Sequence, residues 1–543
     1  MTNQVPEQLV QFISRSISII FLIMLVRTWI RILSNLRGGG ASSGQPPTAA
    51  VLPGRSAPVY WCGLFCFAAI LLSQAFWQLG GFLHDDFMRT VRMYDRRMPN
   101  YARSYQKGLI LDRHGTVLAG NRSEGADIIR YYPYGDASAH IVGYDHFKYG
   151  RTGMEAQRYA YLNGRTVGSA GELMTVLHNL FNHEAMRGND IDLTIDIGLQ
   201  REAVRLLGNR RGAVVVMDPR DGDLIVCASA PGFDTNHLDG ALFDENDESA
   251  PLLNRCFHGR YPPGSTFKII PALLAIRSPK SHVFHCGANG YSPLVNERGI
   301  KDHEFYEARE NNTEWQGHGR IGLRDAFVQS CNVYFAQLGV SLGYDKIYQQ
   351  AQQLLLDRPI QVMPPTRWDE ALVCSASELP SPANVNVMEL TLVSIGQGRL
   401  MVSPLHLCMV SSIIANRGWA PAPRLLRSQS TASLGNALPE DACRHIGTLM
   451  REVVEEGTGR AARGGRVTIA GKTGTAENPC GSGHGIFIGF APCDEPRLAF
   501  AVLIENAGFA SRSAVPVAKQ LMDKAWELGY FAQPPETAGD TSS

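Results

Sequence analysis

A serine and a lysine three residues apart could act together as a nucleophile and its base. They lie in Tyr-Pro-Pro-Gly-Ser-Thr-Phe-Lys at 261–268, where a turn of Pro and Gly opens into an apolar helix. Residues at i and i+3 share one helix face, so the Lys268 amine can reach the Ser265 hydroxyl and take its proton. Unpaired N–H groups at the helix N-terminus could stabilise the oxyanion formed after attack. The pattern predicts Ser265 as a nucleophile.

This pair is a weak signal when it is taken alone. Ser-x-x-Lys arises by composition about once or twice in a chain of this size. Ser104-Tyr-Gln-Lys107 is a second match, in a polar stretch that no turn precedes. A helix-capping Ser265 followed by a Lys268 whose aliphatic stem packs on the surface would explain the same residues. The choice therefore depends on the rest of the chain.

A second stretch, Ser330-Cys331-Asn332, follows a helical pattern over 323–328. A hydroxyl two residues from a carboxamide can project from a tight interhelical loop, with Ser330 relaying protons and Asn332 orienting Lys268 or a substrate amide. Ser-x-Asn also occurs as an ordinary cap or turn. We expect Cys331 to be a packed residue and not a nucleophile.

A third stretch, Gly-Lys-Thr-Gly-Thr at 471–475, ends a β-rich run. Lys472 would supply a positive charge beside the hydroxyl of the second stretch, and Thr473 and Thr475 would hold a carboxylate. Gly474 would let a ligand backbone approach the strand closely. The stretch is not a phosphate loop, because it lacks the Gly-x-x-x-x-Gly spacing before a helix.

The elements around these stretches predict an antiparallel sheet built from both ends of a large domain, 191–530. A helix is predicted over 193–207. The predicted strands are a hairpin of 212–217 with 224–228, turning at Asp221-Gly222, and three strands at 466–474, 484–491 and 497–506. Helical segments lie between the two sets of strands. Such a plan brings residues that are remote in sequence together.

Upstream, residues 84–190 are predicted to form an α+β pedestal. Apolar residues flank Asp112-Arg-His-Gly115, which indicates a hairpin, and a helix should start at Gly153 and end near Gly164. No nucleophile, base and orienting group occur together there. We expect a spacer or a partner-docking module. Residues 531–543 are predicted to be a disordered tail.

The N-terminal part predicts a membrane anchor at 59–83. Val59 to Leu79 is a run of 21 residues without a charge. Arginines precede it and His84-Asp-Asp86 follows, so the positive-inside rule places the later chain outside the cytoplasm. Residues 1–58, with a Gly-rich linker, would be cytoplasmic or membrane-associated. A second crossing over Leu9 to Val26 remains an alternative.

Composition excludes some partners. The chain has 543 residues, with 51 Lys plus Arg against 51 Asp plus Glu, so no global charge favours nucleic acid. The 11 cysteines include no Cys-x-x-Cys pair, and no His cluster has metal spacing, so no metal site is predicted. Cys480 and Cys493, which flank one predicted strand, are the one pair that we would test as a disulfide.

The three motifs, in this order and at this spacing, resemble those of class B penicillin-binding proteins. Their surroundings match too, at 261–268, 329–335, 395–398 with 403–404, 470–477 and 489–492. Gly108 to Gly115 and Gly153-Met-Glu155 are similar to the pedestal of the family, so the resemblance covers about 84–530. It implies an α+β fold: a penicillin-binding, serine β-lactamase-like transpeptidase domain, with an antiparallel sheet flanked by helices, on an α+β pedestal with a transmembrane anchor.

The resemblance implies a D,D-transpeptidase that cross-links peptidoglycan stem peptides and is acylated by β-lactams. Ser265 would attack with Lys268 as base, and Ser330 and Lys472 would protonate the leaving group. The N–H groups of Ser265 and Thr475 would form the oxyanion hole. No cofactor is implied. A polytopic glycan polymerase would be the partner, at the inner (cytoplasmic) membrane of a bacterium, with the catalytic domain extracytoplasmic; the process, elongation-type or related, stays open.

Two departures from the family pattern stand out. Pro271 puts the straightness of the Ser265 helix in doubt, and His484-Gly-Ile-Phe487 has Gly and Ile where the family commonly shows Ala and Trp. Three other functions remain as alternatives: a β-lactam receptor, an inactive cell-wall scaffold and a β-lactamase. A β-lactamase is disfavoured because no Glu-x-x-Leu-Asn occurs between Asn332 and Lys472.

Overall fold

The computed structural model describes residues 27, 57–75, 106–124, 127–164, 187–294, 299–366, 369–478 and 481–531. The chain divides into two compact units, 1–94 and 95–543. The first contains helix α2 (Ala57–Ala75), which covers most of the predicted anchor, while 76–83 lie outside the described residues. Among the described residues, no helix is long and apolar enough to cross a membrane. The anchor at 59–83 therefore stays a prediction.

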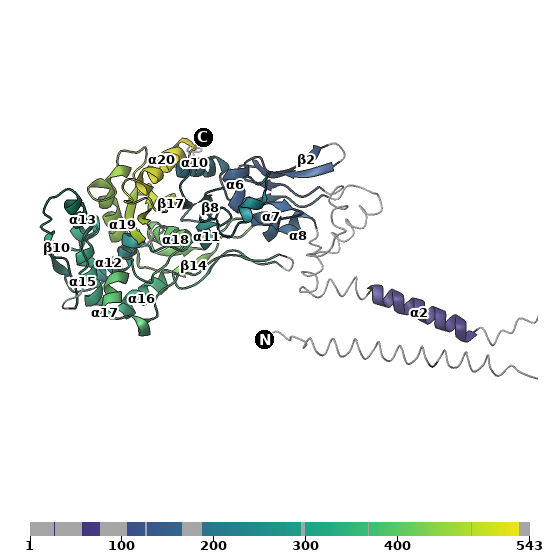
Figure 1. Ribbon diagram of the computed structural model, residues 1–543, viewed down its shortest axis with the longest axis horizontal. Helices are drawn as coiled ribbons and strands as arrows, with labels where there is room; N and C mark the ends of the chain where they lie inside the picture. The colour runs from purple at the N-terminus through teal and green to yellow at the C-terminus, as the bar shows by residue number, and fades with distance from the viewer. Residues whose placement is uncertain are drawn as a thin grey trace, which may run out of the picture. The chain divides into compact units, whose positions relative to one another are not determined.

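The second unit is built on a five-stranded antiparallel sheet (Figure 1). Its order is β15 (Ala470–Asn478), β16 (Gly481–Ala491), β17 (Leu498–Ile504), β7 (Gly212–Met217) and β8 (Leu224–Ala230). β17 pairs with β7, with Val502 opposite Val214. The sheet is thus assembled from both ends of the domain, as predicted. The β7–β8 hairpin turns at Gly222, whose φ of 83° suits glycine.

The strands of this sheet are buried on both faces, because their apolar side chains point alternately into two hydrophobic cores. In β7, Ala213, Val215 and Met217 belong to one core, and Val214 and Val216 belong to the other. Helices α10 (Ile197–Leu207) and α20 (Ala514–Glu527) cover the second face, and α18 (Pro404–Ala415) covers the first (Figure 1). Each Val or Leu buried this way stabilises the fold by about 1.5–3 kcal/mol.

Two predicted boundaries are wrong. The helix predicted from Leu193 begins at Ile197, because the Asp196 carboxylate accepts a hydrogen bond from Leu199 N at 3.0 Å and caps the helix there. Leu193 instead forms a β-bridge with Leu426. The strand predicted from 466 starts at Ala470.

The helix that follows the nucleophile has two parts. Gly264–Lys268 is a 3₁₀ turn (η3), and α12 (Ile269–Ile276) continues from it. Pro271 is the third residue of α12, in the first turn, where a missing N–H is tolerated. Because residues at i and i+3 eclipse in a 3₁₀ turn, Ser265 and Lys268 share one side of it.

The pedestal has a sheet in the order β3 (Asp127–Tyr131), β2 (Val117–Glu124), β1 (Ile110–Leu111) and β6 (Ile191–Asp192). The predicted hairpin at Gly115 is present, with φ 82° at the glycine. β6 pairs parallel to β1, so the first residues of the predicted large domain complete the pedestal sheet. The helix predicted from 153 forms as two pieces, α7 (Gly153–Gln157) and α8 (Tyr159–Leu162).

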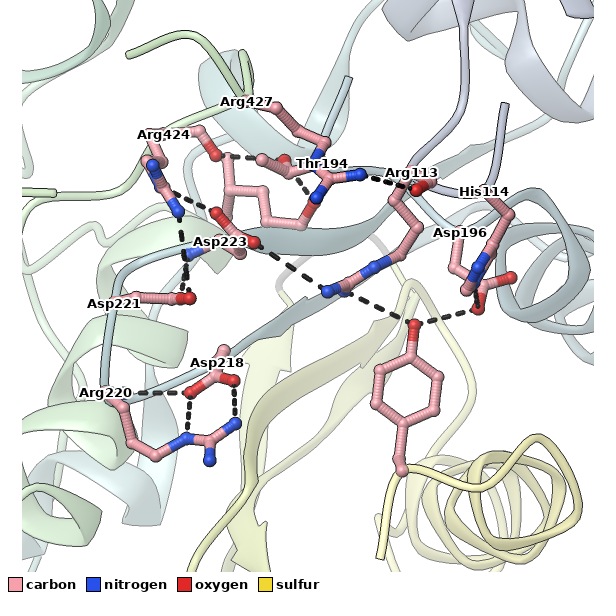
Figure 2. Close-up of polar contacts among 12 residues, drawn as sticks. Arg113, His114, Thr194, Asp196, Asp218, Arg220, Asp221, Asp223, Arg424 and Arg427 are labelled. Carbon is pink, nitrogen blue, oxygen red and sulfur yellow. Dashed lines mark hydrogen bonds and ion pairs between the residues drawn. The ribbon is translucent and has the colours of Figure 1, made fainter. Parts of the chain in front are cut away.

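Polar contacts join the pedestal hairpin to the large domain (Figure 2). Arg113 N donates to Ile195 O at 2.9 Å, and the guanidinium of Arg427 donates to Arg113 O at 2.8 Å. The Tyr530 hydroxyl donates to Asp196 Oδ2 at 2.8 Å. Arg113 Nη1 also donates to the Tyr530 hydroxyl at 3.4 Å, so the hairpin is fixed to the residues that precede α10 and to the turn that follows α20.

Candidate active site

The three motifs converge on one groove of about 700 Å³. Its lining includes Ser265 from the first motif, Ser330 and Asn332 from the second, and Thr473 and Thr475 from the third. The elements that carry them are η3, the loop between α14 (Leu323–Val328) and α15 (Asn332–Leu342), and β15. The three stretches therefore meet at one groove, although they are distant in sequence.

Glycine fixes how closely the nucleophile turn approaches β15. Gly264 has φ 54°, and a Cβ there would come within 2.7 Å of Thr475 O. A Cβ on Gly474 would come within 2.8 Å of Pro263 O. The nucleophile turn thus approaches the strand closely at Gly474, and the approach of a ligand backbone at this glycine stays a prediction. Both glycines allow the Ser265 turn to pack directly on the strand.

Lys268 is fully buried and points its amine at the second motif. Its Nζ donates to Asn332 Oδ1 at 2.7 Å, to Ser330 O at 2.5 Å and to Ser330 Oγ at 3.3 Å. Burial lowers the pKa of Lys268 to about 8, against the opposing attraction of Asp302. An amine with this pKa is partly neutral near physiological pH and can accept a proton.

Lys472, on β15, is also fully buried and reaches the same hydroxyl. Its Nζ donates to Ser330 Oγ at 2.9 Å and to Thr473 O at 3.2 Å. Burial lowers the pKa of Lys472 well below its usual value, and the charge of Lys268 lowers it further. The Ser330 hydroxyl therefore lies between two amines. Such an arrangement can pass a proton from one side of the groove to the other.

Ser330 adopts a conformation that is uncommon for a residue with a side chain. Its φ is 61°, in the left-handed region. Strain of this kind persists only where the surroundings hold it, and it occurs often at functional sites. Ser265, by comparison, is half-buried in the groove. The hydrogen bonds of Lys268 described above run to the second motif, so direct proton transfer from Ser265 stays a prediction.

Sequence reasoning missed two residues that position the motifs. The hydroxyls of Thr458 and Thr473 are 2.5 Å apart. The buried Asp302 carboxylate accepts hydrogen bonds from the backbone N–H groups of Asn332 and, at 3.2 Å, Val333. Neither residue has a motif of its own, because each acts on a motif that is distant in sequence.

Asp302 also belongs to a cluster that could hold a metal ion. Its Oδ2 is 3.0 Å from Cys286 Sγ, 3.4 Å from Cys331 Sγ and 3.4 Å from His318 Nδ1. The four ligand atoms lie within 4.8 Å of one another. Two thiols, an imidazole and a carboxylate form a donor set that suits tetrahedral Zn²⁺. Our prediction of no metal site relied on short spacings, and these ligands are spread from 286 to 331.

A metal here would support the second motif and would lie outside the groove. Cys331 is fully buried, as expected for a packed residue, and burial raises the pKa of its thiol. Its neighbour Cys286 has a lowered pKa, caused first by the hydrogen bond with Cys331. A low thiol pKa favours the thiolate that metals bind. The chemistry supplied would be structural, because Asp302 would join the ion to the start of α15.

Comparison with known proteins gives a consistent result. Residues 212–523 match the family model of the penicillin binding protein transpeptidase domain. The peptidoglycan D,D-transpeptidase MrdA of Acinetobacter baumannii is 32% identical over 457 residues, which span 73% of this chain and 65% of that protein. The peptidoglycan D,D-transpeptidase PbpA of Mycolicibacterium smegmatis is 31% identical over 409 residues, which span 70% of this chain and 79% of that protein.

Similarity extends to solved structures. Penicillin-binding protein A from Mycobacterium tuberculosis, in a ceftriaxone acyl-enzyme complex, aligns with a TM-score of 0.68 at 25% identity. The alignment covers 79% of this chain and 99% of that one. The pedestal and the large domain of this chain thus have counterparts in a protein that reacts covalently with a β-lactam.

Proposed function

Since the chain belongs to the class B penicillin-binding proteins, we propose that it is a serine D,D-transpeptidase that cross-links peptidoglycan stem peptides through an acyl-enzyme on Ser265. One observation carries the assignment of roles: the Ser330 hydroxyl accepts hydrogen bonds from Lys472 at 2.9 Å and from Lys268 at 3.3 Å. Two amines on one hydroxyl, beside a half-buried serine, can move protons in both halves of an acyl transfer.

Acylation begins when Ser265 Oγ attacks the carbonyl carbon of the penultimate D-alanine, with neutral Lys268 taking the hydroxyl proton. A C–O bond forms to Oγ, and the C–N bond to the terminal D-alanine then breaks. The departing nitrogen receives a proton through Ser330 and Lys472. An amine from a neighbouring stem peptide then attacks the acyl carbon and forms a C–N bond. The bond between this carbon and Ser265 Oγ breaks, and the amine proton returns to Oγ by the same groups.

Backbone N–H groups and hydroxyls orient the substrate. The N–H groups of Ser265 and Thr475 form the oxyanion hole, a role that suits the close packing of the turn on β15 at Gly264. Thr473 and Thr475 line the groove and bind the terminal carboxylate. Asn332 holds the Lys268 amine at 2.7 Å with its amide oxygen, and its amide nitrogen donates to Lys301 O at 2.9 Å, which fixes the side chain at the edge of the groove.

A β-lactam would acylate the same serine. Its strained amide presents a carbonyl to Ser265 in the place of the stem peptide, and its ring nitrogen stays attached after opening. No Glu-x-x-Leu-Asn that could activate a water occurs between Asn332 and Lys472. The acyl-enzyme with a β-lactam is therefore long-lived, which distinguishes this protein from a β-lactamase.

The cellular setting follows from the sequence and from the relatives. The apolar run Val59 to Leu79 would anchor the chain in the cytoplasmic membrane, with the groove outside the cytoplasm, where peptidoglycan is cross-linked. The pedestal would contact a polytopic glycan polymerase in the same membrane, by analogy with the family.

Fluorescent penicillin tests the function directly. The purified full chain should carry a stable label, and Ser265→Ala should carry none. Release of D-alanine from a synthetic stem peptide should accompany cross-linking when an acceptor amine is added. Rapid loss of the label would indicate a hydrolase, and absence of label on the unmodified chain would indicate a scaffold. A label without D-alanine release would indicate a receptor.

A further inference from the structure

A buried network connects the nucleophile turn to the end of the central sheet. Glu505 follows directly after β17, and its Oε1 accepts hydrogen bonds from the Tyr261 hydroxyl at 2.8 Å and from Arg255 Nε at 2.8 Å. Its other oxygen lies 3.2 Å from Arg211 Nε. We refer to Arg255, Tyr261 and Glu505 as the Glu505 network. None of its three members lines the groove.

The network is rigid at its base. The side chain of Arg255 is 2% exposed. Its remaining donors are engaged by backbone carbonyls, with NH1 at 3.0 Å from Ala250 O and NH2 at 2.7 Å from Ser249 O. A guanidinium held on three sides fixes the carboxylate that it faces. Burial raises the pKa of Glu505, but hydrogen bonds from Arg255 and Tyr261 bring it below its usual value, so the carboxylate is charged.

Tyr261 connects the fixed Glu505 carboxylate to the nucleophile turn. Its backbone exchanges hydrogen bonds with Val402, at 3.0 and 2.8 Å, and its ring packs edge-on against His484 of β16, with the centroids 5.7 Å apart. Only Pro262, Pro263 and Gly264 separate it from Ser265. Two prolines in succession restrict the backbone. A displacement of Tyr261 is therefore passed on to Ser265.

The position of Ser265 relative to β15 has little tolerance. The Gly264 turn approaches Thr475 so closely that a methyl group would lie 2.7 Å from its carbonyl oxygen. In the proposed function, the oxyanion hole uses one N–H from this turn and one from Thr475. The first donor is carried by the turn that follows Tyr261, and the second by β15, which is joined through β16 to β17, the strand that Glu505 follows. A shift of about 1 Å at a reacting centre can cost on the order of 100-fold in rate.

We propose that Glu505 and Tyr261 are positioning residues for Ser265. The hydrogen bond between the Tyr261 hydroxyl and Glu505 fixes the distance between Ser265 and β15. The proposal rests on the function proposed above for the groove. It gives this hydrogen bond a role in the rate of acylation and not only in stability. Neither residue touches the substrate.

Tyr261→Phe removes the hydroxyl and leaves Glu505 paired with Arg255 and Arg211. We expect the rate of acylation at saturating fluorescent penicillin to fall by about 10- to 100-fold. The concentration giving half the maximal rate should stay near that of the unmodified chain, because the groove lining is unchanged. Stopped-flow labelling over a range of penicillin concentrations separates the two quantities.

Tyr530→Phe is a matched control. The Tyr530 hydroxyl also donates to a carboxylate at 2.8 Å, that of Asp196, but at the pedestal junction. It should lower the unfolding temperature about as much as Tyr261→Phe and acylate at the unmodified rate. Equal slowing by both variants, or no slowing by Tyr261→Phe, would overturn the proposal.

Two Glu505 variants provide an independent readout. Glu505→Gln keeps an oxygen that can accept from Tyr261, whereas Glu505→Ala does not, so acylation should decrease from the unmodified chain to Gln to Ala. If Tyr261→Phe fails to fold, the order of these two variants decides the question, and equal rates for Gln and Ala would contradict the proposal. Absence of any label on the unmodified chain would instead mean that the proposed function fails.

Discussion

Lys472 Nζ donates a hydrogen bond to Ser330 Oγ at 2.9 Å, although the two residues lie 142 positions apart in the chain. Both side chains are buried, and Lys268 reaches the same oxygen from the other side at 3.3 Å. Two buried amines so close together repel each other when both are charged. The favoured state is therefore one in which one amine is charged and the other is neutral. The groove thus holds an acid and a base at one hydroxyl.

Removing the Lys472 amine should stop proton delivery without weakening the fold. For Lys472→Met we expect acylation by fluorescent penicillin to fall on the order of 100-fold or more. The unfolding temperature should stay equal or rise, because a buried amine is replaced by an apolar side chain of similar length. Lys519→Met, which removes an exposed amine, should change neither quantity. Normal acylation by Lys472→Met would exclude the role given to this lysine.

The rate of acylation should increase with pH. The pKa of Lys268 is lowered to about 8 by burial, so its neutral, proton-accepting form becomes dominant only above this pH. Labelling rates measured from pH 6 to pH 10 should rise, reach half their maximum near pH 8 and level off above that pH. A rate that falls as pH rises through this range would contradict the assignment of Lys268 as base.

Stability should follow pH in a window set by the same residue. The folded pKa of about 8 lies below the ordinary value of 10.5, so between these values the unfolded chain binds more protons. Stability should therefore rise with pH across this window, by on the order of 3 kcal/mol from Lys268. Urea unfolding at pH 7.5, 9 and 10 measures the slope, which should decrease in Lys268→Met.

The cluster of Cys286, Asp302, His318 and Cys331 should bind one Zn²⁺ per chain. Metal analysis of the full chain purified without chelator should find the ion, and removal by a strong chelator should lower the unfolding temperature. His318→Ala should retain no metal, whereas Cys408→Ala, which changes a buried cysteine outside the cluster, should retain it. An unmodified chain without metal, with no thermal response to added Zn²⁺, would refute the site.

A methyl group at Gly474 should separate the nucleophile turn from β15. Its Cβ would meet Pro263 O at 2.8 Å and Thr266 Cγ2 at 2.9 Å, so the turn has to move. We expect Gly474→Ala to acylate at least about 10-fold more slowly. Gly240→Ala, where no atom lies within 4 Å of the added methyl, should behave as the unmodified chain. Equal rates for both variants would mean that this contact is not needed.

The sequence was sufficient for the groove but not for what supports it. Ser265, Ser330 and Lys472 are visible as three motifs in order, and the alternating strands around them predict the sheet that brings them together. Asp302, Thr458 and Glu505 act through hydrogen bonds to partners that are distant in sequence, so no local pattern marks them. The metal ligands were not predicted for the same reason, because they are far apart in sequence.

Errors at element boundaries have local causes. Leu193 has the apolar spacing of the helix that follows, but it pairs with Leu426 instead, and the cap at Asp196 decides where α10 begins. The predicted helix at 153–164 is interrupted at Arg158, whose φ of −132° and ψ of 32° are not helical and whose guanidinium donates to the carbonyl of Pro364 at 2.7 Å. Tertiary contacts of this kind override the periodicity of a short segment.

The pairing of β17 with β7 has a consequence for biogenesis. Leu503 lies opposite Ala213, so the strand that carries Lys472 joins the earlier hairpin only through segments that are translated last. About 290 residues are synthesised between the paired positions of β7 and β17, so one edge of β7 lacks its pairing strand until β17 is available. Any factor that shields this edge until β17 pairs with β7 would therefore raise the yield of correctly folded protein.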